Sequence, residues 1–343
     1  MRRLLRVSIV ALTLGGYAWG TAQAQALGLS MFGLVDAALE YSNRDANSTV
    51  DGSARQEGQS GLRVQSGVQY GSRLVFAGAH ELGAETRAIF TIEHRFAVDT
   101  GDTLGGNGAV PGSLKYWNAR AWAGLDGPWG RITAGRQYVP LFNAFLPIDV
   151  TGFGFYNSMD RYFNLRVDNS LEYVTPTVGG LTGAFMYAAG ESFDTVSRAD
   201  SWGAGFKWLR GNWIAGAGYM RYGQTSGVAR EEWGIGLSYR FAPETQWGLA
   251  YIESDRSGIP THSYHVSGSV RLAGGTVLLN WARLMQTGLP DSGRWGLSYR
   301  VPLSNRTQWY VSSGYNADLT RTPSAPLVQF NELRLAMGIL HRF

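Results

Sequence analysis

The chain has 343 residues, including 46 Gly and no Cys, and aromatic residues make up 13% of it. Its formal net charge is +4, and the basic residues do not form the clustered excess typical of a nucleic-acid-binding surface. Beyond the N-terminus, no apolar run approaches the about 18 residues of a membrane-spanning helix, which excludes an α-helical membrane protein. A soluble enzyme of this length would show helical periodicity, and the sequence shows almost none.

Residues 1–24 are expected to be a cleaved signal peptide. Three Arg among the first six residues form a basic head, and the apolar stretch that follows is too short to span a bilayer. The small residues of Ala22-Gln23-Ala24 predict cleavage after Ala24, with cleavage after Ala26 as the alternative. Removal of the three Arg would leave the mature chain, 25–343, with a net charge of +1.

Short segments of alternating apolar and polar residues follow. In Glu232 to Arg240, one parity carries Trp, Ile, Leu and Tyr, and the other carries Gly, Ser and charged residues; Arg294 to Arg300 repeats the pattern. Residues two apart on a strand share a face. Trp and Tyr around aliphatic residues are typical of aromatic girdles at two membrane interfaces. A soluble sandwich also alternates, but the small and charged face would make a poor dry core and suits a wet lumen.

The alternating segments predict an all-β protein, a 16-stranded antiparallel transmembrane β-barrel. Bacterial single-chain barrels have an even number of strands, with short turns at one rim and long loops at the other. The connectors of this chain alternate in length in the same way. The predicted strands are 27–41, 61–81, 84–96, 114–126, 130–138, 168–178, 181–190, 201–210, 213–222, 231–241, 245–255, 262–273, 275–286, 293–303, 307–318 and 330–343.

The stretch 139–166 does not alternate. It contains two Pro, two Gly and many large aromatic residues. Structureless segments of this length are uncommon in compact domains and are usually functional or disordered, and the aromatic content argues against disorder. We therefore expect this third long loop to fold into the lumen and to set the width and charge of a pore.

The last strand alternates fully and ends in an aromatic residue. Leu333, Leu335, Met337, Ile339 and Phe343 share one face. A terminal Phe on an alternating strand resembles the recognition signal of the outer-membrane assembly machinery.

Taken together, these features resemble a Gram-negative general porin of the neisserial and betaproteobacterial type. The motifs that carry the resemblance are MFGLVDAALEYS at 31–42, GSR at 71–73 with ELG at 81–83, RAIFTIE at 87–93, AWAGLDGPWGRITAGRQY at 121–138, RVDNSLEYVTP at 166–176 and HRF at 341–343. The resemblance covers essentially the whole mature chain. It implies an outer-membrane homotrimer in contact with lipids, including lipopolysaccharide. It also implies an inward third loop and passive diffusion of ions and small hydrophilic solutes. Ala77 and His80 depart from the basic and acidic residues frequent in the family, so the charge pattern of the constriction is expected to differ.

Parity along the strands selects candidate lumen residues. Arg73 lies opposite in parity to the apolar Leu74 and Phe76, and Arg87 and Glu93 lie opposite to Ala88, Phe90 and Ile92. The same reasoning places Arg120 inward, whereas Arg136 ends its strand at the root of the loop and can lean either way. An Arg on the lipid face near the bilayer midplane would cost about 2–4 kcal/mol, which favours inward placement.

The loop supplies Asp149 and Asp160 as candidate acids. We hypothesise that Arg73, Arg87 and Arg120 form a basic wall across the lumen from these acids. Opposed charges in a constriction set ion preference by attracting one sign and repelling the other. The alternative is that the Arg side chains pair with carboxylates and fix the loop.

Other function classes have weaker support in the sequence. An enzyme needs a nucleophile or an activated water with a general base, but His262 and His265 lie three apart on a predicted strand and face opposite ways. No cofactor and no metal site is therefore predicted. A substrate-selective porin, for a sugar, phosphate or an aromatic acid, is the alternative function, and the loop aromatics keep it open. A purely structural or adhesive barrel would need a lumen too narrow to conduct, whereas sixteen strands predict a wide one.

Overall fold

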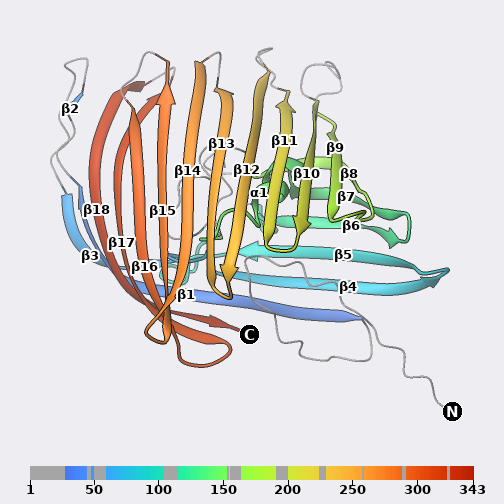
Figure 1. The fold of residues 1–343 in the computed structure, drawn as a ribbon, viewed down its shortest axis with the longest axis horizontal. Helices are drawn as coiled ribbons and strands as arrows, with labels where there is room; N and C mark the ends of the chain where they lie inside the picture. Colours follow the sequence, from blue (N-terminus) through green and yellow to red (C-terminus); the bar gives the residue numbers. More distant parts are fainter. Residues whose placement is uncertain are drawn as a thin grey trace.

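In the computed structural model, the chain forms one β-sheet that closes on itself (Figure 1). The structure describes residues 28–44, 48–49, 59–103, 115–152, 154, 164–190, 200–223, 229–256, 259–287, 291–322 and 325–343. The predicted signal peptide and Asp160 lie outside the described residues. The elements are β1 (Leu29–Arg44), β2 (Ser48–Thr49), β3 (Gln59–Ser66), β4 (Arg73–Gly83), β5 (Thr86–Arg95), β6 (Arg120–Gly127), β7 (Gly130–Tyr138), α1 (Pro140–Phe145), β8 (Arg166–Val174), β9 (Leu181–Ala188), β10 (Ser201–Arg210), β11 (Trp213–Tyr222), β12 (Arg230–Ala242), β13 (Thr245–Arg256), β14 (Ile259–Leu272), β15 (Gly275–Gln286), β16 (Ser292–Pro302), β17 (Thr307–Thr322) and β18 (Ala325–Arg342).

The sheet is closed by the first and last strands. One edge of β1 pairs antiparallel with β18, and its other edge pairs with β3 and then β4. Because β3 and β4 lie end to end along β1, they occupy one position around the barrel, and β2 is an extra strand of two residues. The described strands therefore confirm the predicted sixteen-stranded antiparallel barrel. A closed barrel has no exposed sheet edge, which in a membrane would leave backbone groups unpaired.

Most predicted strands differ in extent by a few residues from those in the structure, and three of these differences have a clear local cause. The strand predicted at 61–81 is interrupted at 67–72, between β3 and β4. The strand predicted from 114 begins only at Arg120. Before it, the Asn118 side chain accepts a bond from the Arg95 backbone N–H at 2.8 Å and donates one to the Arg95 carbonyl at 2.9 Å, in place of backbone pairing. β8 ends at Val174, two residues before Pro176, which lacks the N–H that a ladder needs.

The outer face of the barrel is apolar. On β12, Trp233, Ile235 and Leu237 are 38%, 56% and 44% exposed, whereas the inward Glu232 and Ser238 are 0% and 2% exposed. Such a continuous apolar surface favours contact with lipid over contact with water. No helix in the described part of the chain is long and apolar enough to cross a membrane.

One rim of the barrel, the short-turn rim, carries turns of two to six residues. They connect β4 to β5, β6 to β7, β8 to β9, β10 to β11, β12 to β13, β14 to β15 and β16 to β17. In an antiparallel order these turns alternate with the other connections, which lie at the opposite rim. One of those other connections is the inner loop, residues 139–165 between β7 and β8, of which 139–152, 154 and 164–165 are described.

The inner loop begins with helix α1 and packs against the inner wall of the barrel. Figure 1 shows α1 beside β10, β11 and β12. Leu141, Phe145 and Ile148 are at most 1% exposed. A Cβ on Gly216 would lie 2.5 Å from the Ala144 carbonyl oxygen, and a Cβ on Gly248 would lie 2.1 Å from that of Ile148. Glycine therefore lets the loop backbone approach the wall closely.

This packing corrects one interpretation of the sequence. The small inward residues were expected to suit a wet lumen. On β10–β13 the small residues, mainly glycines, instead form a surface against which apolar loop side chains pack. These side chains form a dry core on one side of the barrel. The loop was also expected to lack regular structure, but the run from Pro140 to Phe145 forms a helix. Pro at a first helical position is compatible with a helix because that N–H needs no intrahelical partner.

Candidate functional site

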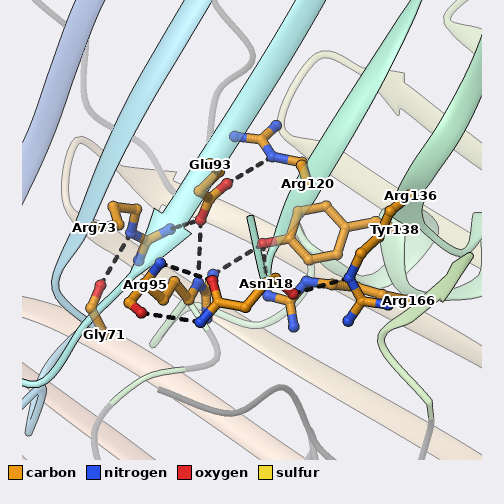
Figure 2. A network of polar contacts seen from close by, with 9 residues as sticks. All are labelled: Gly71, Arg73, Glu93, Arg95, Asn118, Arg120, Arg136, Tyr138 and Arg166. Atoms are coloured by element: carbon orange, nitrogen blue, oxygen red, sulfur yellow. Dashed lines mark hydrogen bonds and ion pairs between the residues drawn. The ribbon is translucent and has the colours of Figure 1, made fainter. Parts of the chain in front are cut away.

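A buried carboxylate, Glu93 on β5, is surrounded by guanidinium groups (Figure 2). Arg120 Nε lies 2.6 Å from Glu93 Oε2, and Arg95 Nε lies 3.1 Å from Glu93 Oε1. Arg73 Nη1 lies at 3.8 Å from the same Oε1. An unpaired carboxylate would lose its hydration on burial at a high cost in free energy. The charge-assisted bonds from several guanidinium groups compensate Glu93 for that loss.

Tyr138, at the end of β7, joins a fourth arginine to this group. Its hydroxyl accepts bonds from Arg95 Nη2 at 2.8 Å and from Arg166 Nη2 at 3.1 Å. The Arg166 guanidinium lies 4.6 Å from the centre of the Tyr138 ring, within the range of a cation–π contact. We call Arg73, Arg95, Arg120 and Arg166, with Glu93 and Tyr138, the arginine cluster.

Strand register brings the arginine cluster together. Glu93 and Arg95 are two apart on β5 and share its inner face. Arg73 on β4 is directly opposite Arg95, Arg120 on β6 is opposite Glu93, and Arg166 on β8 is opposite Tyr138. Like charges directly opposite each other on neighbouring strands are destabilising. Glu93 and the Tyr138 hydroxyl therefore offset the Arg73–Arg95 repulsion.

The predicted residue Arg136 lies beside the arginine cluster and extends its positive charge. Its Nε donates to the Asn118 carbonyl at 2.9 Å, and its Nη1 lies 2.6 Å from Asp168 Oδ1. Lys115 also pairs with Asp168. Because two cations share one carboxylate, this neighbouring group has a net positive charge.

Arg87 is not brought to the arginine cluster. It pairs with Asp126 near the two-residue turn between β4 and β5. It precedes Glu93 by six positions on β5, which corresponds to about 20 Å along the strand. Its inward parity was predicted, but its depth in the barrel was not.

Asp149 lies away from the arginine cluster, in contact with β14. It is 1% exposed, accepts bonds from the Thr151 N–H at 3.0 Å and hydroxyl at 2.8 Å, and lies 3.7 Å from His265 Nε2. Asp149 thus helps to fix the inner loop on the wall. Glu93, which comes from the barrel itself, is the carboxylate that the arginines surround.

The site residues predicted from the sequence do not include three members of the arginine cluster: Arg95, Tyr138 and Arg166. Arg95 shares the parity of Glu93, and this signal could have identified it. Tyr138 and Arg166 flank the inner loop, and nothing in the sequence shows that their side chains meet at 3.1 Å.

The electrostatics of the arginine cluster favour anions. Four arginines against one glutamate leave three positive charges in excess, and guanidinium groups stay protonated in proteins. Arg95 has a side chain 24% exposed, more than that of Arg73 or Arg120. The described residues contain no group of three or more His, Cys, Asp or Glu placed to share a metal ion.

Comparisons with known proteins identify a shared architecture. A family model described as Gram-negative porin matches residues 10–319. Outer membrane porin protein 32 of Delftia acidovorans is 29% identical over 331 residues, which cover 89% of this chain and 88% of that protein.

Two solved structures have the same fold. An anion-selective porin from Comamonas acidovorans aligns with a TM-score of 0.73 and 22% identity, covering 92% of this chain and 99% of that one. The trimer form of OmpT from Vibrio cholerae aligns with a TM-score of 0.61 and 13% identity, covering 92% of this chain and 99% of that one.

Proposed function

The chain belongs to the Gram-negative porin family and forms an outer-membrane diffusion channel, and from this premise we propose that it prefers anions. Ions and small hydrophilic solutes cross a general diffusion porin passively. In the proposed pore the narrowest part lies between the arginine cluster and the inner loop, residues 139–165.

The observation that carries this proposal is the excess of guanidinium groups around Glu93. Arg73, Arg95 and Arg120 all lie within 4 Å of one carboxylate, so their charges are only partly neutralised. A ring or cluster of one sign attracts counter-ions and repels co-ions. The Arg136–Asp168–Lys115 group adds a further positive charge beside it.

Zero-current potentials in a salt gradient test the preference. We expect the purified protein in a planar bilayer, with KCl diluted on one side, to give a potential of the sign that chloride permeation produces. The preference should weaken at about 1 M salt, where the Debye length falls to about 3 Å. A potential of the sign that potassium permeation produces, at low salt, would contradict the proposal.

The substrate-selective alternative has less structural support. It depended on loop aromatics lining the path, but Phe142 and Phe145 are at most 4% exposed and pack in the core of the inner loop. The loop aromatics within 155–163 lie outside the described residues, as does Phe153. Saturable block of the current by a candidate solute would favour this alternative.

The partners complete the proposal. We infer a homotrimer in contact with outer-membrane lipids, including lipopolysaccharide. The family and the fold support a channel rather than an enzyme.

Phe343 exchanges backbone bonds with Gly33 at 3.1 and 3.2 Å, next to the closing β1–β18 pair. Recognition of Phe343 by the assembly machinery would thus precede closure of the barrel.

A further inference from the structure

The interruption between β3 and β4 leaves extra chain inside the barrel. Ser66 pairs with Ala37 and Arg73 pairs with Leu34, so only Val35 and Asp36 of β1 stand opposite the six residues 67–72. A regular ladder would use two residues here. We call 67–72 the inward segment, because its Gln69 is fully buried and reaches Ser298 on β16 and Ser312 on β17 at 2.8 and 2.7 Å.

Asp36 on β1 binds the backbone of the inward segment. Its Oδ2 accepts the backbone N–H groups of Gln69 at 2.7 Å and Tyr70 at 2.8 Å. Its Oδ1 accepts the hydroxyl of Tyr310, which passes over Gly338 to reach it. Asp36 is 0% exposed, so these charge-assisted bonds replace its hydration.

Arg300 on β16 binds two side chains of the same segment. Its Nε donates to Gln69 Oε1 at 2.5 Å, and its Nη1 donates to the Tyr70 hydroxyl at 3.1 Å. The guanidinium also lies 5.0 Å from the centre of the Tyr70 ring. Gln69 and Tyr70 are therefore fixed by side chains from three different positions around the barrel.

The inner loop rests on this fixed segment. A Cβ on Gly154 would lie 1.5 Å from the Gln69 carbonyl oxygen, and a Cβ on Gly152 would lie 2.8 Å from the Tyr70 ring. On its other side the loop is held to β14, where the Val150 N–H donates to Ser267 Oγ at 3.0 Å. The inner loop thus spans the lumen between β14 and the inward segment.

The inward segment also contacts the arginine cluster. Arg73 Nε donates to the Gly71 carbonyl at 3.1 Å. The same six residues therefore touch both the inner loop and one of the arginines between which the proposed constriction lies.

We propose that Asp36 is a positioning residue for the constriction. Through the inward segment it keeps the inner loop in one place, and so keeps the pore at one conductance level. This inference rests on the proposed function, since it assumes that the inner loop and the arginine cluster bound the narrowest part of the pore.

Single-channel recording of Asp36→Asn tests the proposal. The substitution keeps the shape but removes the charge that the two N–H groups and the Tyr310 hydroxyl share. We expect the fraction of time spent at a second conductance level to rise by more than about tenfold, the factor that corresponds to loss of one hydrogen bond to a charged group, because all three bonds lose the charge of their acceptor. Tyr310→Phe, which removes one bond and leaves the charge, should change this fraction in the same direction and by less.

Glu332→Gln is the matched control. Glu332 is also a buried inner-face carboxylate, 2% exposed, but its bonds go to Ser42 and Arg334. Its variant should keep the wild-type current levels. A folded Asp36→Asn protein, shown by its resistance to SDS at room temperature, with wild-type occupancy of the levels would overturn the inference. If Asp36→Asn does not fold, Tyr310→Phe decides in the same way.

The zero-current potential from the same recordings separates this inference from the proposed function. A wild-type pore without anion preference would contradict the proposed function. The comparison of current levels between Asp36→Asn and wild type would still decide the role of Asp36.

Discussion

Replacing Arg73 and Arg95 together with Gln should lower the anion-to-cation permeability ratio of the pore about tenfold at low salt. Each unit charge contributes about 1 kcal/mol at 4 Å in water, so loss of two would change the local anion concentration about thirtyfold without salt, and screening reduces the expected change to about tenfold. Arg120 is retained because it makes the shortest contact with Glu93, 2.6 Å, and keeps that buried carboxylate paired. Zero-current potentials in a KCl gradient measure the ratio.

Arg87→Gln provides the matched control. It also removes an inward guanidinium, but one that pairs with Asp126 near the short-turn rim. The structure predicts a ratio close to that of the wild type. A larger shift from Arg87→Gln than from the double variant would place the selective region at the short-turn rim.

Deletion of 143–160 should raise the single-channel conductance roughly twofold or more, because a barrel of sixteen strands without an inner loop leaves a wide aqueous channel. The deletion removes Phe145 and Ile148, which pack against glycines of the barrel wall. It preserves the root of the loop, where the Val139 N–H donates to the Leu165 carbonyl at 3.1 Å and Asn164 N lies 3.1 Å from Glu232 Oε2.

Deletion of 191–199, between β9 and β10, is the control for loop shortening. Wild-type conductance is expected, since the proposed constriction involves none of these residues. If the 143–160 variant folds and conducts like the wild type, the inner loop does not narrow the path.

The barrel could be predicted from the sequence because its signal is local. Trp295, Leu297 and Tyr299 alternate with polar residues within a single strand, and the same alternation recurs in other strands, such as 232–240. The interruption at 67–72 could not be found in this way. It depends on Asp36 and Arg300, which are remote in sequence and offer the segment enough bonds to leave the ladder.

The candidate site was predicted in part. Parity correctly places Arg73, Glu93 and Arg120 on the inner face, but it gives no depth, and so Arg87 was grouped with residues far along the barrel. Asp149 was expected to face the arginines because its charge is complementary. Its position is instead set by the burial of the adjacent Ile148 and by its contacts with Thr151 and His265.

Accessibility of position 95 during conduction tests the account most directly. The chain has no Cys, so Arg95→Cys introduces a single reactive thiol at the arginine side chain of the cluster that is most exposed. We expect a small anionic thiol reagent, added while current is recorded, to reduce the current and move the zero-current potential toward potassium, because a neutral thiol becomes a negatively charged group at the constriction. Unchanged current and potential in protein that mass spectrometry shows to be modified at position 95 would contradict the assignment of the arginine cluster to the pore.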